Sequence, residues 1–101
     1  RHLAAVEALS KSTMLKADES KAWALLAISE AHLQRWKDSA AHFEIALRYQ
    51  PYNATWWLDL AEACFHGGME AAYQAALTKL DALDPKLAKE ARAFKPRRAA
   101  R

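Results

Sequence analysis

Among the residues of this chain, two histidines, His32 and His66, have the spacing that best suits a metal site. They are 34 residues apart, and two imidazoles on neighbouring helices about 8–10 Å apart could share a metal ion. A third ligand is not obvious beyond the carboxylate of Glu62. We therefore interpret both histidines as polar residues at the end of a groove, and we predict no metal site. His42 is expected to face solvent.

Signatures of catalysis are not found in the sequence. It has no Gly-rich phosphate loop, no Gly-x-Ser-x-Gly motif and no pair of carboxylates isolated among apolar residues. The single cysteine, Cys64, excludes an internal disulfide framework and a multi-cysteine zinc site. It shares a helical stripe with Trp57 and Leu60, which predicts a buried and unreactive thiol. We expect no enzyme activity and no cofactor.

The chain contains an internal repeat. Trp23-x-x-Leu26-Ala27 returns as Trp57-x-x-Leu60-Ala61 after 34 residues. The same offset relates residues 20–53 to residues 54–87, and it pairs Pro51 with Pro85, His32 with His66, Ala41 with Ala75, Phe43 with Leu77 and Tyr49 with Leu83. A period in this range is typical of stacked helical hairpins, in which each unit offers the same face to the next.

Helices are expected throughout, because the 101 residues are 52% hydrophobic with only 2 Gly and 3 Pro. Asn53 can cap a helix that Gly67 and Gly68 end, and Pro51 and Pro85 interrupt others. The predicted helices cover residues 3–15, 21–34, 37–49, 54–66, 70–83 and 86–95. Short connections make neighbouring helices antiparallel. The predicted fold is an all-α superhelix of about six helices.

This pattern resembles the tetratricopeptide repeat (TPR), a 34-residue helix-turn-helix unit with the motif W-x2-L-G-x2-Y … A-x3-F … P. The matching residues are Trp23, Leu26, Phe43, Ala46 and Pro51 in the first unit and Trp57, Leu60, Leu77, Leu80 and Pro85 in the second. The departures are Ala27 and Ala61 for Gly, Glu30 and Cys64 for Tyr, and Ser39 and Tyr73 for Ala.

The resemblance divides the chain into a tetratricopeptide-like domain at 1–94 and a basic flexible tail at 96–101. The domain would contain a half repeat at 3–17, repeats at 20–53 and 54–85, and a capping helix at 86–95. Trp23 and Trp57 are interpreted as core residues, since aromatic side chains at helical spacing usually bury area. Trp56 lies one residue off that stripe, and a partner contact, a neighbouring chain or half-burial would each explain it.

A groove for a partner is implied by the same resemblance. The helix at 21–34 has two apolar sides and so needs two partners, one of which is its hairpin mate. In tetratricopeptide domains, the first helices of the repeats line a concave groove that holds a peptide. The predicted groove residues are Lys21, Ala24, Leu25, Ile28, His32, Thr55, Leu58, Asp59, Glu62, Phe65, His66, Lys89 and Arg92.

The family's clamp for the C-terminal carboxylate of heat-shock chaperones does not match. Ala24, Ile28, Leu58 and Glu62 stand where its Lys and Asn would be. An apolar groove with Asp59 and Glu62 suits a hydrophobic or a basic peptide instead.

The predicted function is a protein–protein interaction module, acting as an adaptor or an assembly scaffold. One alternative is a chaperone of the bacterial secretion type, cradling a hydrophobic client segment. Another is a structural self-assembly domain, in which a neighbouring copy fills the groove. Separately, exposure of Val6, Leu9 and Leu15 on the first helix would favour a homodimer through that helix.

Charge and hydropathy limit the other partners. Four of the positive charges behind the net +3 lie in residues 95–101, which leaves residues 1–94 at −1. Such a tail could contact phosphates weakly, but no specific nucleic-acid partner is predicted. No apolar run approaches the roughly 20 residues that span a bilayer. The compartment is not identified, although the cytoplasm is slightly favoured.

Overall fold

The computed structural model describes residues 20–94 of the chain, and these residues form helices without any strand. The helices are α2 (Ser20–His32), α3 (Trp36–Tyr49), α4 (Ala54–His66), α5 (Glu70–Leu83) and α6 (Pro85–Arg92). The all-α prediction is confirmed. The predicted first helix at 3–15, its half repeat at 3–17 and the tail at 96–101 lie outside the described residues, as does the proposed dimer contact.

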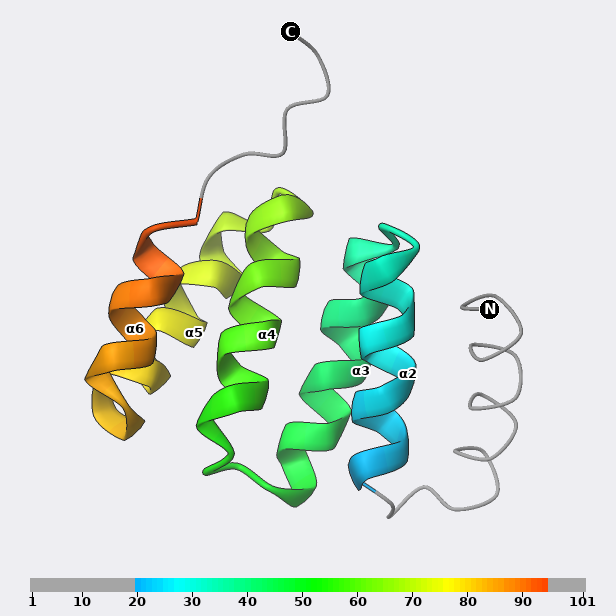
Figure 1. Cartoon of the computed structure of the whole chain (residues 1–101), viewed down its shortest axis with the longest axis horizontal. Helices are drawn as coiled ribbons and strands as arrows, with labels where there is room; N and C mark the ends of the chain where they lie inside the picture. Colours follow the sequence, from blue (N-terminus) through cyan, green and yellow to red (C-terminus); the bar gives the residue numbers. More distant parts are fainter. Residues whose placement is uncertain (1–19, 95–101) are drawn as a thin grey trace, which may run out of the picture.

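The helices form two antiparallel hairpins, α2–α3 and α4–α5, followed by α6. Helix α3 packs on α4, and α6 packs on both α5 and α4. Figure 1 shows α2, α4 and α6 running in one direction, with α3 and α5 running in the other. This arrangement puts the first helix of each hairpin beside the first helix of the next.

The repeat seen in the sequence is present in the backbone. Gln34, two residues after the end of α2, has φ 60°, and Gly68, two residues after the end of α4, has φ 75°, again 34 residues later. The amide of Arg35 donates to the carbonyl of Glu30 at 2.8 Å, and that of Met69 donates to Cys64 at 2.9 Å. Both turns therefore have the left-handed residue and the six-to-one hydrogen bond of a Schellman motif.

The other helix ends are defined by local hydrogen bonds. The Asn53 side chain accepts from the amide of Trp56 at 3.2 Å, as its capping role predicts. Asp84 likewise accepts from the amide of Lys86 at 3.1 Å and begins α6 at Pro85. Helix α6 ends at Arg92 rather than at residue 95. The backbone amide of Ala93 donates to the carbonyls of Glu90 and Ala91 in the last turn of the helix.

The core is made largely of small side chains. Fully buried alanines lie where helices meet, among them Ala27, Ala46, Ala61, Ala76, Ala88 and Ala91. Because these side chains are short, neighbouring helices can approach closely around the few larger residues, of which Phe43 is the largest fully buried one. Trp23 and Trp57 pack against this core but are only partly buried.

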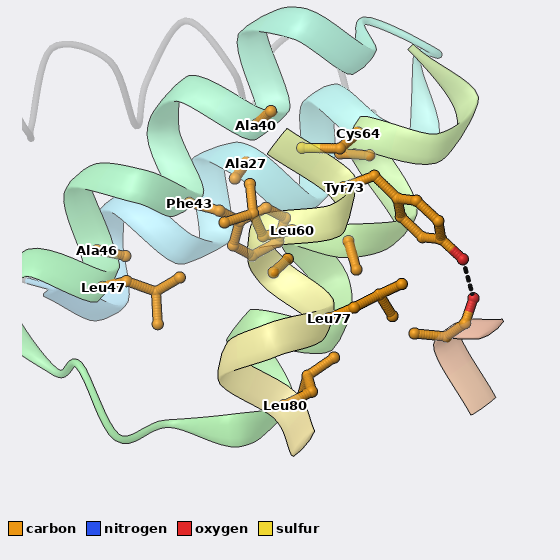
Figure 2. Packing of buried hydrophobic residues seen from close by; sticks show 14 of the residues in the cluster. Ala27, Ala40, Phe43, Ala46, Leu47, Leu60, Cys64, Tyr73, Leu77 and Leu80 are labelled. Carbon is orange, nitrogen blue, oxygen red and sulfur yellow. Dashed lines mark hydrogen bonds between the residues drawn. The ribbon is translucent and has the colours of Figure 1, made fainter. Parts of the chain in front are cut away.

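Residues that depart from the repeat motif form polar contacts inside the core. The Ser39 hydroxyl donates to the carbonyl of Ala27 at 2.7 Å. The Tyr73 hydroxyl, at the equivalent position, donates to the carbonyl of Ala91 at 2.6 Å, which is the dashed line in Figure 2. Tyr73 therefore ties α6 to α5, and α6 extends the row begun by α2 and α4.

Candidate functional site

A pocket of about 320 Å³ lies between α2, α3 and α4. Four of the predicted groove residues line it: Ile28 and His32 from α2, and Asp59 and Glu62 from α4. Within each pair the residues are three or four positions apart, so they lie on one face of their helix. The facing sides of α2 and α4 thus form the pocket.

Four further lining residues were not predicted as groove residues. These are Ala31, Trp36, Phe43 and Ala63. Trp36 and Phe43 belong to α3, the second helix of the first hairpin, whereas the prediction considered only first helices. An apolar residue at the start of α3, just after the hairpin turn, was the signal that could have identified Trp36.

The remaining predicted residues lie outside this pocket. Lys21, Leu25, Thr55 and Lys89 are exposed, Ala24 is buried in the core, and Leu58 is partly buried against it. Phe65 and His66 belong to an aromatic group in which the Phe65 ring centroid is 5.4 Å from that of Tyr73 and 6.0 Å from that of Phe94. These two residues therefore contribute packing where α4 meets α5 and the residues after α6.

Arg92 is engaged away from the pocket. Its guanidinium donates to both carboxylate oxygens of Asp81 on α5, at 2.9 and 2.6 Å. The hydrogen bond from Arg92 lowers the pKa of Asp81. In this structure α6 does not direct its arginine toward Asp59 and Glu62.

The electrostatics of the pocket centre on Asp59. The pKa of this carboxyl is raised to about 6, mainly by burial and also by the nearby charge of Glu62. Among residues 20–94, no lysine or arginine forms an ion pair with Asp59. Nε2 of His66 is 3.8 Å from Oε2 of Glu62, and its ring is 4.9 Å from that of Trp36, between centroids. The pocket is therefore acidic on its α4 side, and its α2 and α3 sides are apolar apart from His32.

A second ionisable pair lies inside the first hairpin. Nδ1 of His42 is 2.6 Å from Oε1 of Glu30, and the His42 ring stacks on Trp23 at 5.4 Å between centroids. The expectation that His42 faces solvent is wrong, because its side chain is only 25% exposed. Burial raises the pKa of Glu30, while the contact with His42 lowers it. Glu30 and His42 do not line the pocket, so we assign this pair a structural role.

The chemical alternatives can be examined in the same range. Cys64 is buried, as predicted, and burial raises the pKa of its thiol to about 11. Residues 20–94 contain no group of three or more His, Cys, Asp or Glu side chains that could hold a metal ion. None of the helices formed by these residues is long and apolar enough to cross a membrane.

A second, more apolar hollow of about 360 Å³ lies between α3 and α5. Trp57 and Leu60 lie beneath it, with Ala72 and Ala75 from α5 at its side. The Lys79 ammonium is 6.0 Å from the Trp57 ring. This hollow was not among the sites predicted from the sequence, although a tryptophan facing alanines of the next helix could have indicated it.

Comparison with known protein-family models and with curated proteins finds no match to this chain. The resemblance to tetratricopeptide repeats therefore depends on the chain's own 34-residue period, in sequence and in backbone.

Proposed function

We propose that this chain is a tetratricopeptide-type module that binds a peptide or a helix of a partner protein, without catalysing a reaction. The partner would lie between α2 and α4, and the protein would act as an adaptor or an assembly scaffold. The observation that carries this proposal is the pocket between α2, α3 and α4, which combines apolar walls with two carboxylates. Binding sites typically combine apolar walls with a few placed polar groups.

The repeat supports the same proposal. Equal turns follow α2 and α4, and the two helices run in the same direction (Figure 1), so corresponding faces can lie on one side. Such a surface is formed before binding, which reduces the entropy that a partner must lose on association. Stacked helical repeats use surfaces of this kind for recognition.

The test is a comparison of partner capture by the wild-type chain and an Ile28→Asn variant. Ile28 is partly buried in the pocket wall, so an amide at this position should reduce capture without changing net charge. Ala82→Asn is the matched control, because Ala82 is exposed on α5. Circular dichroism should show equal helicity in all three proteins. Equal capture of the same partners by Ile28→Asn and Ala82→Asn would exclude this pocket as the binding site.

Self-assembly is the second candidate function, and exposed apolar side chains favour it. Leu25 is 53% exposed on α2, and Tyr52 is 82% exposed in the loop before α4. A homo-oligomer would cover such residues, and its mass measured by light scattering would rise with concentration. A constant monomer mass would contradict self-assembly and leave the pocket for another protein.

The chaperone alternative differs from the adaptor in what is bound. A chaperone would co-purify in a fixed ratio with one unstable client, whereas an adaptor would bind short peptides from stable proteins. Co-expression followed by quantification of the bound chain distinguishes the two.

A further inference from the structure

We propose that the pocket between α2, α3 and α4 receives a lysine or arginine side chain that the partner presents next to an apolar residue. This inference rests on the proposed function and specifies the partner as a basic, amphipathic peptide segment. Charge complementarity with the α4 side of the pocket is the main argument.

The carboxylates of the pocket differ from the other buried or partly buried carboxylates of the described chain. Glu30 has His42 at 2.6 Å, and the Asp84 side chain caps α6. Asp59 has neither an ion pair nor a capping role within residues 20–94. Within residues 20–94, the ion-pair contact of Glu62 is with Nε2 of His66 at 3.8 Å, and the Glu62 side chain is 48% exposed. Two carboxylates one turn apart thus face the pocket with little internal compensation.

The apolar lining fits the stem of a basic side chain. Ile28 and Ala31 of α2 face Ala63 of α4, and Trp36 and Phe43 of α3 line the same space. Lysine and arginine bury their methylene stems along apolar surfaces while the charged group remains at a polar edge. A volume of about 320 Å³ is near the lower end for ligand pockets, so it suits a side chain or two rather than a folded element.

The cost of ionising Asp59 is consistent with a cationic partner. Burial raises the pKa of this carboxyl to about 6, so it is ionised near pH 7.5 but less favourably than in water. A bound ammonium or guanidinium would stabilise the ionised form, and this differential interaction would appear as affinity. A carboxylate of a bound ligand would make the ionisation of Asp59 still less favourable, which argues against an acidic ligand.

Blocked, fluorescein-labelled heptapeptides provide the test, with the full chain in solution at pH 7.5. The first has the sequence Gly-Ser-Leu-Lys-Leu-Ser-Gly, and two others carry Gln or Glu in place of Lys. Fluorescence anisotropy should show the Lys peptide binding roughly tenfold more tightly than the Gln peptide, with the Glu peptide weakest. The preference should decrease at high salt, because part of it is electrostatic.

Substitutions on α4 test whether its carboxylates cause the preference for the Lys peptide over the Gln peptide. Asp59→Asn should reduce the preference for Lys over Gln to about twofold or less. Glu90→Gln is the matched control, because Glu90 is exposed on α6 and also loses one negative charge. Glu62→Gln, at a more exposed position, keeps the test valid if Asp59→Asn alters folding. An undiminished preference in both pocket variants would overturn the proposal.

The outcomes separate this inference from the function on which it rests. Equal affinity for the Lys and Gln peptides, both lost in Ile28→Asn, would overturn the basic-anchor proposal and leave a peptide-binding pocket. No binding of any peptide, together with unchanged partner capture by Ile28→Asn, would overturn both proposals. Strong binding of the Lys peptide only after residues 95–101 are deleted would identify this chain's own basic segment as the occupant, and would overturn an external partner.

Discussion

At the scale of single residues, Asp59 is a carboxyl whose surroundings disfavour its charge. Burial raises its pKa from 3.8 to about 6. A group with a raised folded-state pKa stabilises the fold below its unfolded pKa, and this contribution is lost as the pH rises through the folded value. Ionised Asp59 therefore destabilises the unbound protein at neutral pH. Such a conflict between stability and charge is common at binding sites.

Asp59→Asn should increase the stability of the unbound protein at neutral pH. The gain should be on the order of 1–2 kcal/mol at pH 7.5, allowing for solvent around a half-buried group, and should approach zero near pH 4. Urea unfolding at both pH values measures it. Equal free energies of unfolding for the variant and the wild type at pH 7.5 would mean that ionised Asp59 does not destabilise the folded protein.

The Glu30 carboxyl is also partly desolvated, but unlike Asp59 it has a hydrogen-bond partner, His42. His42→Ala leaves the buried Glu30 carboxylate without its hydrogen-bond partner and should destabilise the protein by about 1–3 kcal/mol. Lys37→Ala, at an exposed position earlier in α3, should change stability by less than about 0.5 kcal/mol. Chemical denaturation of both variants provides the comparison.

At the scale of helices and turns, the turns of the two hairpins have the same backbone conformation but different residues. Gly68 adopts its positive φ without strain, whereas Gln34 adopts nearly the same conformation with a side chain. The Gly67-Gly68 end of α4 could be predicted from the sequence for this reason. The equivalent turn at Gln34 could not, since glutamine gives no signal for a left-handed residue.

Gln34→Gly should therefore stabilise the protein by roughly 0.5–1 kcal/mol, because it removes strain at a positive φ. Gly68→Ala should destabilise it by about 1 kcal/mol for the same reason. At Gly68 no atom would crowd an added Cβ, so the effect reports backbone conformation alone. Thermal unfolding of the pair is a direct test, and shifts of the same sign in both variants would contradict it.

Helix types and most boundaries were predictable because caps, prolines and glycines act locally. Side-chain pairs across a hairpin were not, because they depend on which faces meet after packing. His42 illustrates this limit, since its solvent-facing prediction ignored Glu30 and Trp23 on the neighbouring helix. Four of the thirteen predicted groove residues, Ile28, His32, Asp59 and Glu62, line one pocket, whereas a prediction based on first helices could not include Trp36.

At the scale of the whole molecule, α6 is the shortest helix among the described residues, and it packs on α4 and α5 but not on the first hairpin. The Tyr73 hydroxyl reaches the Ala91 carbonyl at 2.6 Å, and the Phe94 ring centroid is 6.0 Å from that of Phe65. In Figure 1, α6 lies at the opposite end of the row from α2. Local opening of α6 should therefore leave the first hairpin and the pocket intact.

Tyr73→Phe tests this difference. Loss of the hydrogen bond should cost about 0.5–1.5 kcal/mol and accelerate hydrogen exchange at residues 88–94. Exchange within α2 should remain unchanged. Equal acceleration in α2 and α6 would mean that the described helices open only as one unit.

Gly67 gives the close approach of the two hairpins a further consequence. A Cβ at this position would lie 3.1 Å from the Cβ of Trp36, across the boundary between the hairpins, and 2.9 Å from the Ala63 carbonyl oxygen. Trp36 is itself a wall of the pocket. A side chain at position 67 would therefore crowd Trp36, and we expect it to change the dimensions of the pocket although residue 67 does not line it.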